Sequence, residues 1–135
     1  MTERQTEGGT GLSIIILDDE PIVCKRLKPT LQRKGYEVET FSDGPQALAR
    51  LEERVFDIVI TDLKMGTIDG MHVLENVKAA HPDTQVIIIS GFATLETAKE
   101  SFRKGAFDFV AKPFKINEIL ECVKRIEENR NKGKK

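Results

Sequence analysis

A chain of 135 residues has the length of one ordinary domain and is long enough to bury a core of its own. Hydrophobic residues make up 39% and charged residues 32% of the chain, a composition that excludes intrinsic disorder. The formal net charge of −1 gives no bulk attraction to nucleic acid or to an anionic membrane. We therefore predict neither as a direct partner.

The cysteines and the polar N-terminus predict a cytoplasmic protein. Cys24 and Cys122 fall within helical patterns, and their spacing fits neither a disulfide framework nor a zinc site. Residues 1–11 lack the apolar segment of a signal peptide and offer nothing to bury, so we expect a disordered N-terminal lead. No apolar run approaches the ~20 residues that a membrane span needs.

Residues 12–53 show two strand patterns and two helical patterns. An apolar run at 12–17 predicts a buried strand, and Pro21 suits the first turn of the helix that follows. Gly35 is placed to end that helix. Residues 36–41 alternate apolar and polar side chains, which predicts a strand at an edge of the sheet, and a second amphipathic helix follows.

The stretch from residue 55 to 70 is the centre of the predicted fold. Its β-branched residues 58–60 are typical of a strand buried on both faces, and the strand ends at Asp62. A loop rich in glycine and aspartate then leads to Gly70. A third helix follows and stops before Pro82.

The remainder of the chain repeats the alternation twice more. Strands are predicted at 85–89 and 107–111, on either side of a helix from about residue 94 to Gly105. A last helix starts near residue 116. A basic tail over 129–135 is expected to be unstructured.

Strict alternation of strands and helices over 12–128 predicts a single α/β domain. The (βα)5 pattern indicates a doubly wound parallel sheet with right-handed crossovers and helices on both faces. The strand order 2-1-3-4-5 is taken over from known flavodoxin-like sheets, for which it is a general order.

Polar side chains follow four of the five strand patterns. Asp18 and Asp19 follow the first strand, Asp62 the third, Ser90 the fourth and Lys112 the fifth. Because the carboxyl ends of parallel strands share one edge of the sheet, we expect these side chains to converge. Crowded carboxylates need a compensating cation, and oxygen ligands of this kind suit Mg²⁺.

Such a cluster suits the transfer of a phosphoryl group to a carboxylate. Asp62 would be the nucleophile, while a metal and the Lys112 ammonium would hold the equatorial oxygens. Most of the catalysis would be positioning and charge neutralisation. His72 and His81 lie on or beside the third helix, where we expect surface roles.

These motifs resemble the receiver domain of two-component response regulators over almost all of residues 12–128, most of all receivers of nitrogen-regulatory-type transcription activators. The matching segments are Ile-Ile-Leu-Asp-Asp-Glu (15–20), Ile-Val-Ile-Thr-Asp-Leu-Lys-Met (58–65), Ile-Asp-Gly-Met (68–71), Val-Ile-Ile-Ile-Ser-Gly (86–91) and Lys-Gly-Ala-Phe-Asp-Phe-Val-Ala-Lys-Pro-Phe (104–114). Two departures are Gly66, where the family often has proline, and Ser90, where it often has threonine. Neither removes a chemical group.

The resemblance implies a phosphorylation-dependent signalling switch. Asp62 would accept a phosphoryl group from the histidine of a sensor kinase. Asp19 and Asp62, with the backbone carbonyl of Lys64, would bind Mg²⁺, and Asp18 would act through a water. Only self-phosphorylation and autodephosphorylation are expected, rather than turnover of a separate substrate.

The same resemblance assigns the remaining site residues. Lys112 would contact the phosphoryl oxygens, and the Lys112–Pro113 bond is expected to be cis. Ser90 would be the switch hydroxyl and Phe109 the switch aromatic, relaying the change to the surface of helix 4, strand 5 and helix 5. Lys64 and Phe92 lie two residues beyond Asp62 and Ser90, so we expect both to tune the lifetime of the phosphorylated state.

Two other functions share part of this pattern. A Mg²⁺-dependent aspartyl-phosphate phosphohydrolase would share the Asp62 chemistry, but such enzymes usually carry a general acid where this chain has Lys64. A flavin-binding electron carrier of the same strand order would need a phosphate-cradling loop after the first strand. The acids at 18–20 have the wrong charge for that.

The expected partners are a sensor histidine kinase and, through the helix 4–strand 5–helix 5 surface or helix 5, a second copy of the chain. The apolar stripe Leu120, Val123 and Ile126 could run on into a linker helix or a dimer interface, or could simply pack on its own sheet. The resemblance further implies control of transcription as part of a longer bacterial regulator.

Overall fold

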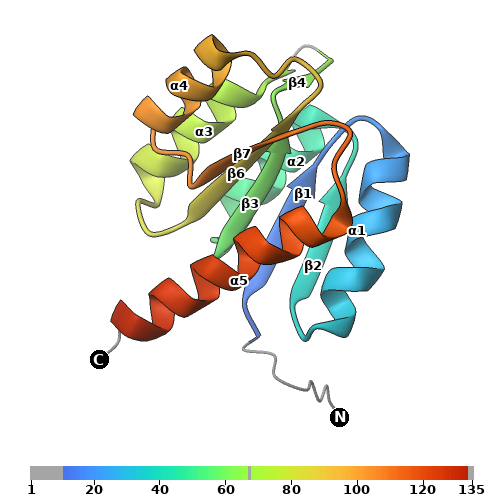
Figure 1. The fold of residues 1–135 in the computed structure, drawn as a ribbon, viewed down its shortest axis with the longest axis vertical. Helices are drawn as coiled ribbons and strands as arrows, with labels where there is room; N and C mark the ends of the chain where they lie inside the picture. Colours follow the sequence, from blue (N-terminus) through green and yellow to red (C-terminus); the bar gives the residue numbers. More distant parts are fainter. Residues whose placement is uncertain (1–10, 67, 134–135) are drawn as a thin grey trace.

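The computed structural model describes residues 11–66 and 68–133, which form a parallel sheet with helices on both faces (Figure 1). The sheet has five strands in the order β2-β1-β3-β6-β7, and every neighbouring pair is parallel. The predicted fold class and strand order are therefore confirmed. The strands are β1 (Ser13–Leu17), β2 (Glu37–Phe41), β3 (Ile58–Asp62), β6 (Gln85–Ser90) and β7 (Asp108–Ala111).

The sheet separates two hydrophobic clusters. Alternate side chains of β1 show the division, because Ile14 and Ile16 pack with α1 and α5, whereas Ile15 and Leu17 pack with α2 and α3. All four of these side chains are fully buried, as expected for a strand covered on both faces. The helices are α1 (Pro21–Arg33), α2 (Gly44–Glu53), α3 (Gly70–Ala80), α4 (Leu95–Arg103) and α5 (Ile116–Gly133).

A short hairpin follows β3, where the sequence predicts only a loop. Strands β4 (Lys64–Met65) and β5 (Ile68–Asp69) pair antiparallel and lead directly into α3. At the start of α3, the Gly70 N–H donates to the Leu63 carbonyl oxygen at 2.7 Å. A Cβ atom at Gly70 would lie 2.3 Å from the carbonyl oxygen of Asp62, so only glycine allows this close approach. The hairpin and α3 thus hold the segment that carries Asp62.

Helix α5 extends further than expected. It reaches Gly133, so the prediction of an unstructured tail over 129–135 is wrong for residues 129–133, while 134–135 lie outside the described residues. The extension is held on the body of the domain, because Arg130 forms an ion pair with Asp57 at 3.0 Å and the Tyr36 hydroxyl donates to Glu127. Of the predicted N-terminal lead, residues 1–10 also lie outside the described part of the chain.

Candidate functional site

The carboxyl edge of the sheet brings three aspartates together, as the strand pattern predicted. Carboxylate oxygens of Asp18, Asp19 and Asp62 all lie within 4.8 Å of one another. Asp18 and Asp19 follow β1, and Asp62 ends the neighbouring strand β3. The Asp18 and Asp62 side chains are buried and Asp19 is exposed, so the cluster opens to solvent on one side.

Lys112 is the cation at the centre of this cluster. Its Nζ lies 2.9 Å from Asp18 Oδ2, 3.1 Å from Asp62 Oδ2 and 2.7 Å from Glu20 Oε1. Partial burial lowers the pKa of Lys112, but its hydrogen bond to Glu20 and its ion pair with Asp18 outweigh burial, so this pKa lies above its ordinary value. The ammonium is therefore held in its charged form.

Main-chain contacts place Lys112 beside the aspartates. It follows β7, and its N–H donates to the Ser90 carbonyl oxygen at 2.8 Å, so the end of β7 is tied to the end of β6. The peptide bond from Lys112 to Pro113 is cis, as expected from the resemblance.

Burial perturbs the Asp18 carboxyl. Its burial is the largest effect and raises its pKa to about 6, against the lowering effects of the Glu20 N–H and of Lys112. Asp18 Oδ2 pairs with the Lys112 ammonium at 2.9 Å, and among the described residues no other group donates a hydrogen bond to it. One ammonium shared by these carboxylates leaves an excess of negative charge. The donor set therefore fits a hard divalent cation such as Mg²⁺.

The other predicted residues lie around this cluster. Ser90 ends β6, is fully buried, and its Oγ accepts the Phe92 N–H at 2.8 Å. Phe109 lies opposite Ile88 in the sheet register and is half-buried against the cluster formed with α2 and α3. Lys64 follows Asp62 in the chain, and its N–H lies 3.3 Å from Asp62 Oδ1.

Two contacts at the mouth of the site were missed from the sequence. The first is the ion pair between Glu20 and Lys112, whose partners lie far apart in the chain. The second joins the two residues expected to tune lifetime, because Lys64 Nζ lies 5.3 Å from the centre of the exposed Phe92 ring, in cation–π geometry. The only sequence signals for these contacts were the position of Glu20 after two aspartates and the paired spacing of Lys64 and Phe92.

Comparison with known proteins identifies the family. The family model for the response regulator receiver domain matches residues 14–124. The chain belongs to the response regulator receiver domain family. It is 33% identical to the transcriptional regulatory protein ZraR of Salmonella typhimurium over 114 residues. The aligned segment covers 84% of this chain and 26% of that protein. This receiver domain thus spans about a quarter of the length of that curated relative.

Solved receiver domains share the fold of this chain. A response regulator receiver domain protein from Clostridium thermocellum has a TM-score of 0.81 at 30% identity, over 89% of this chain and 97% of that one. The beryllofluoride-activated NtrC4 receiver domain dimer has a TM-score of 0.81 at 29% identity, over 87% and 97% of the two chains.

In the described part of this receiver domain, no helix has the length and apolar character to cross a membrane.

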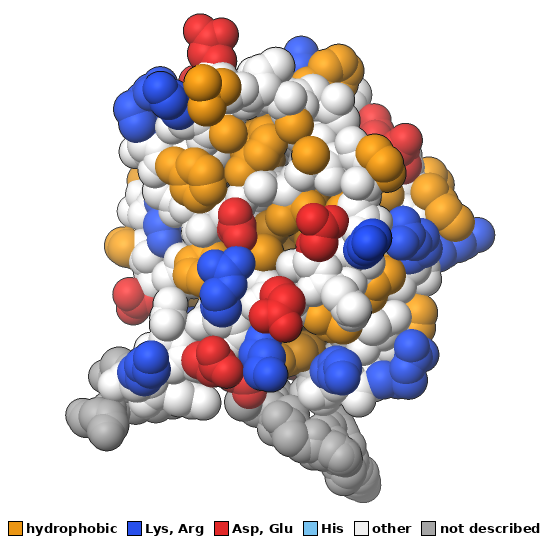
Figure 2. Space-filling view, in the orientation of Figure 1, with side chains coloured by type: hydrophobic (Ala, Val, Ile, Leu, Met, Phe, Trp, Pro, Cys, Tyr) orange, Lys and Arg blue, Asp and Glu red, His pale blue; other side chains and the backbone are white. Residues whose placement is uncertain are grey.

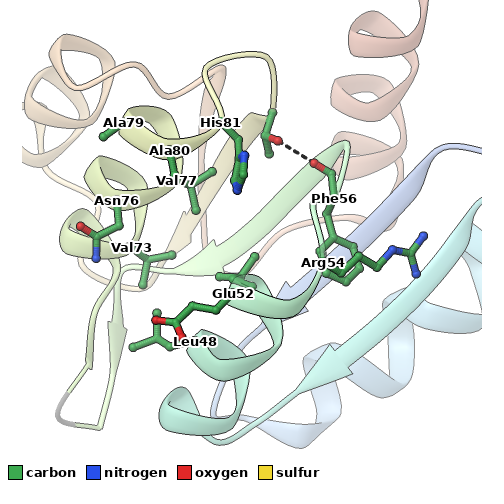
Figure 3. A pocket seen from close by; sticks show the side chains of 12 residues that line it. Leu48, Glu52, Arg54, Phe56, Val73, Asn76, Val77, Ala79, Ala80 and His81 are labelled. Carbon is green, nitrogen blue, oxygen red and sulfur yellow. Dashed lines mark hydrogen bonds between the residues drawn. The ribbon is translucent and has the colours of Figure 1, made fainter.

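A separate cleft of about 580 Å³ lies between α2 and α3 (Figure 3). Its lining is largely apolar and includes Leu48, Val73 and the half-buried His81, while His72 is exposed elsewhere on α3. At its edge, the Thr84 hydroxyl donates to the Phe56 carbonyl oxygen at 2.6 Å. Neither Lys112 nor the carboxylates that contact it line this cleft, so it is separate from the aspartate cluster.

The raised pKa of Asp18 predicts how stability depends on pH in the absence of divalent metal. Because the pKa of about 6 in the fold exceeds the ordinary value of 3.8, this carboxyl favours folding at low pH, and that contribution is lost as pH rises through 6. At pH 7, Asp18→Asn should therefore raise the free energy of unfolding by about 1–3 kcal/mol. Urea unfolding in a chelator at several pH values measures this. A gain at pH 7 that persists unchanged well below pH 4 would contradict it.

Proposed function

We propose that Asp62 accepts a phosphoryl group from the histidine of a sensor kinase, in a Mg²⁺-dependent reaction. The observation that carries this proposal is the contact of Lys112 Nζ with Asp62 Oδ2, inside a cluster of three aspartates. Asp19, Asp62 and the Lys64 carbonyl would hold the metal, with Asp18 acting through a water. Bound Mg²⁺ supplies the positive charge that the crowded carboxylate and phosphoryl oxygens need.

The chain's own residues then have simple tasks. An oxygen of the ionised Asp62 carboxylate attacks the phosphorus, the phosphorus–nitrogen bond of the donor phosphohistidine breaks, and the imidazole leaves with a proton from solvent. Asp62 needs no general base, because it is already an anion. The Lys112 ammonium binds a phosphoryl oxygen and offsets its charge.

The switch is proposed to run through Ser90 and Phe109. The Ser90 Oγ accepts the Phe92 N–H, so its own hydroxyl proton can be donated to a phosphoryl oxygen. Movement of Ser90 leaves space that the half-buried Phe109 fills, and the surface of α4, β7 and α5 changes. Shifting such a two-state equilibrium from 1:99 to 99:1 takes roughly 5.5 kcal/mol. A few hydrogen bonds to charged groups, at ~1.5–3 kcal/mol each, could supply it.

A second copy of the chain is proposed to bind the α4–β7–α5 surface. Leu95 and Phe102 of α4 are 74% and 49% exposed, and Figure 2 shows apolar side chains gathered over this part of the molecule. The α5 stripe is an unsuitable dimer surface, because Val123 and Ile126 are buried against the sheet. The NtrC4 receiver, a structural neighbour, is a dimer in its beryllofluoride-activated form.

The curated relatives support a proposal about the wider role of this domain. Since the ZraR protein is a transcriptional regulator about four times as long as the matched segment, we propose that this domain controls transcription within a longer cytoplasmic bacterial regulator. A phosphohydrolase acting on separate substrates is disfavoured, because the residue two positions beyond Asp62 is Lys64, whose ammonium lies over Phe92. Absence of phosphomonoester turnover would agree with this.

Phosphorylation of Asp62 can be tested with acetyl phosphate and Mg²⁺. The parent chain should gain the mass of one phosphoryl group, and Asp62→Asn should gain none, because the nucleophile is lost. Asp83→Asn, which alters an exposed aspartate after α3, should react like the parent. Intact-mass spectrometry provides the measurement, and sizing of the same samples reports dimer formation. Equal modification of Asp62→Asn and parent would exclude Asp62 as the acceptor.

The relay through Ser90 predicts that Ser90→Ala can be phosphorylated but loses the structural response to phosphorylation. After phosphorylation, this variant should lack most of the NMR chemical-shift changes that the parent shows in α4 and β7, because no hydroxyl remains to bind the phosphoryl group. The modification itself, checked by mass, should still occur. The coupling is refuted if the α4 shifts match those of the phosphorylated parent.

Removal of the Phe92 ring should shorten the lifetime of the phosphorylated state. Phe92→Ala frees Lys64 and opens the mouth of the site to water, so autodephosphorylation should speed up about two- to fivefold, the range expected for loss of an exposed cation–π contact. Val55→Ala trims another exposed apolar side chain, just before β3, and should leave the rate unchanged. Decay of the phosphorylated species after removal of the donor gives the rate, and equal decay of Phe92→Ala and parent would count against the idea.

A further inference from the structure

Among the carboxylates around Lys112, Glu20 has no part in the phosphoryl transfer proposed above. Its Oε1 nevertheless lies 2.7 Å from Lys112 Nζ, closer than the oxygens of Asp18 and Asp62. The Glu20 side chain is 58% exposed, whereas those of Asp18 and Asp62 are 0% and 8% exposed. Glu20 therefore holds the ammonium from the solvent side of the cluster.

The fold does not need this carboxylate for α1. Glu20 is the N-cap residue of α1, yet its side chain makes no capping hydrogen bond. Its structural contacts come from the backbone, because its N–H donates to Asp18 Oδ1 at 2.8 Å and its carbonyl oxygen accepts the Val23 N–H at 3.0 Å. Replacement of the side chain leaves these contacts in place.

Lys112 has more acceptors than it can keep when a phosphoryl group arrives. An ammonium group has three N–H donors, and carboxylate oxygens of Asp18, Glu20 and Asp62 already lie within 3.1 Å of it. Loss of the contact with buried Asp18 would leave a buried charge unpaired, which is strongly unfavourable. Glu20 is exposed, returns to water easily, and forms the kind of ion pair that stabilises little. Glu20 is thus the partner that Lys112 gives up.

We propose that Glu20 is a positioning residue that competes with the phosphoryl group for Lys112, an inference that rests on the phosphoryl transfer to Asp62 proposed above. In the unphosphorylated chain, the Glu20 carboxylate holds the ammonium at the mouth of the site. On phosphorylation, the ammonium turns to a phosphoryl oxygen and Glu20 is released to solvent. The contact slows phosphorylation, because it must break before Lys112 can bind the incoming group.

Glu20→Gln tests the competition, because it keeps the size of the side chain and removes its charge. At saturating Mg²⁺ with acetyl phosphate as donor, its phosphorylation rate constant should exceed that of the parent by about two- to fivefold, the range for loss of an exposed ion pair. Glu128→Gln removes the same charge from an exposed position near the end of α5 and should react like the parent. Equal melting temperatures check that both variants fold.

A second measurement needs neither metal nor donor. In metal-free protein, NMR should show faster hydrogen exchange of the Lys112 ammonium in Glu20→Gln than in the parent, and no change in Glu128→Gln. An unchanged or lower phosphorylation rate, or unchanged exchange, would overturn the proposal. So would an acceleration confined to acetyl phosphate and absent with the less negative donor phosphoramidate, since that result means simple repulsion of the donor. If the parent itself is never phosphorylated, the proposed function fails, while the exchange measurement still reports on the contact.

Discussion

The central constraint in this domain is an imbalance of charge at one edge of the sheet. Carboxylates of Asp18, Glu20 and Asp62 contact the Lys112 ammonium, and that of Asp19 lies beside Asp18 and Asp62. Burial of Asp18 makes the imbalance costly, as its pKa of about 6 shows. Such a site persists in the folded chain, and binding of a further positive charge stabilises it. That property makes it suited to bind a divalent metal and, with it, a phosphoryl group.

Backbone contacts, rather than side chains, hold the cluster together. The Leu63 N–H donates to the Ile89 carbonyl oxygen at 3.0 Å, and the Lys112 N–H donates to that of Ser90 at 2.8 Å, so the ends of β3, β6 and β7 are tied in series. Gly70 allows α3 to pack directly on the segment after Asp62. The acids are therefore held close by hydrogen bonds that their own repulsion does not break.

The sequence predicted the parts of this arrangement that follow from strand topology. Apolar runs identify β1, β3 and β6, and the carboxyl ends of parallel strands must meet, so Asp18, Asp62 and Lys112 were expected together. The tail at 129–133 was wrongly expected to be unstructured, and its Arg130 pairs with Asp57, a partner far along the chain that no local sequence pattern indicates. The β4–β5 hairpin was missed for a similar reason, since each of its strands has only two residues and shows no periodicity.

Side-chain exposure divides the residues of the site into a buried group and an exposed group, which differ in how far substitutions disturb the fold. Asp18, Asp62 and Ser90 are buried, and any change in them alters charge or packing in the core of the fold. Glu20, Lys64 and Phe92 are exposed, belong to segments that follow strand ends, and contact one another or Lys112 only through side chains. Changes in this second group can adjust how fast the site is modified and how long it stays modified without cost to the fold. The chemistry is therefore set by the buried group, and its timing by the residues at the mouth.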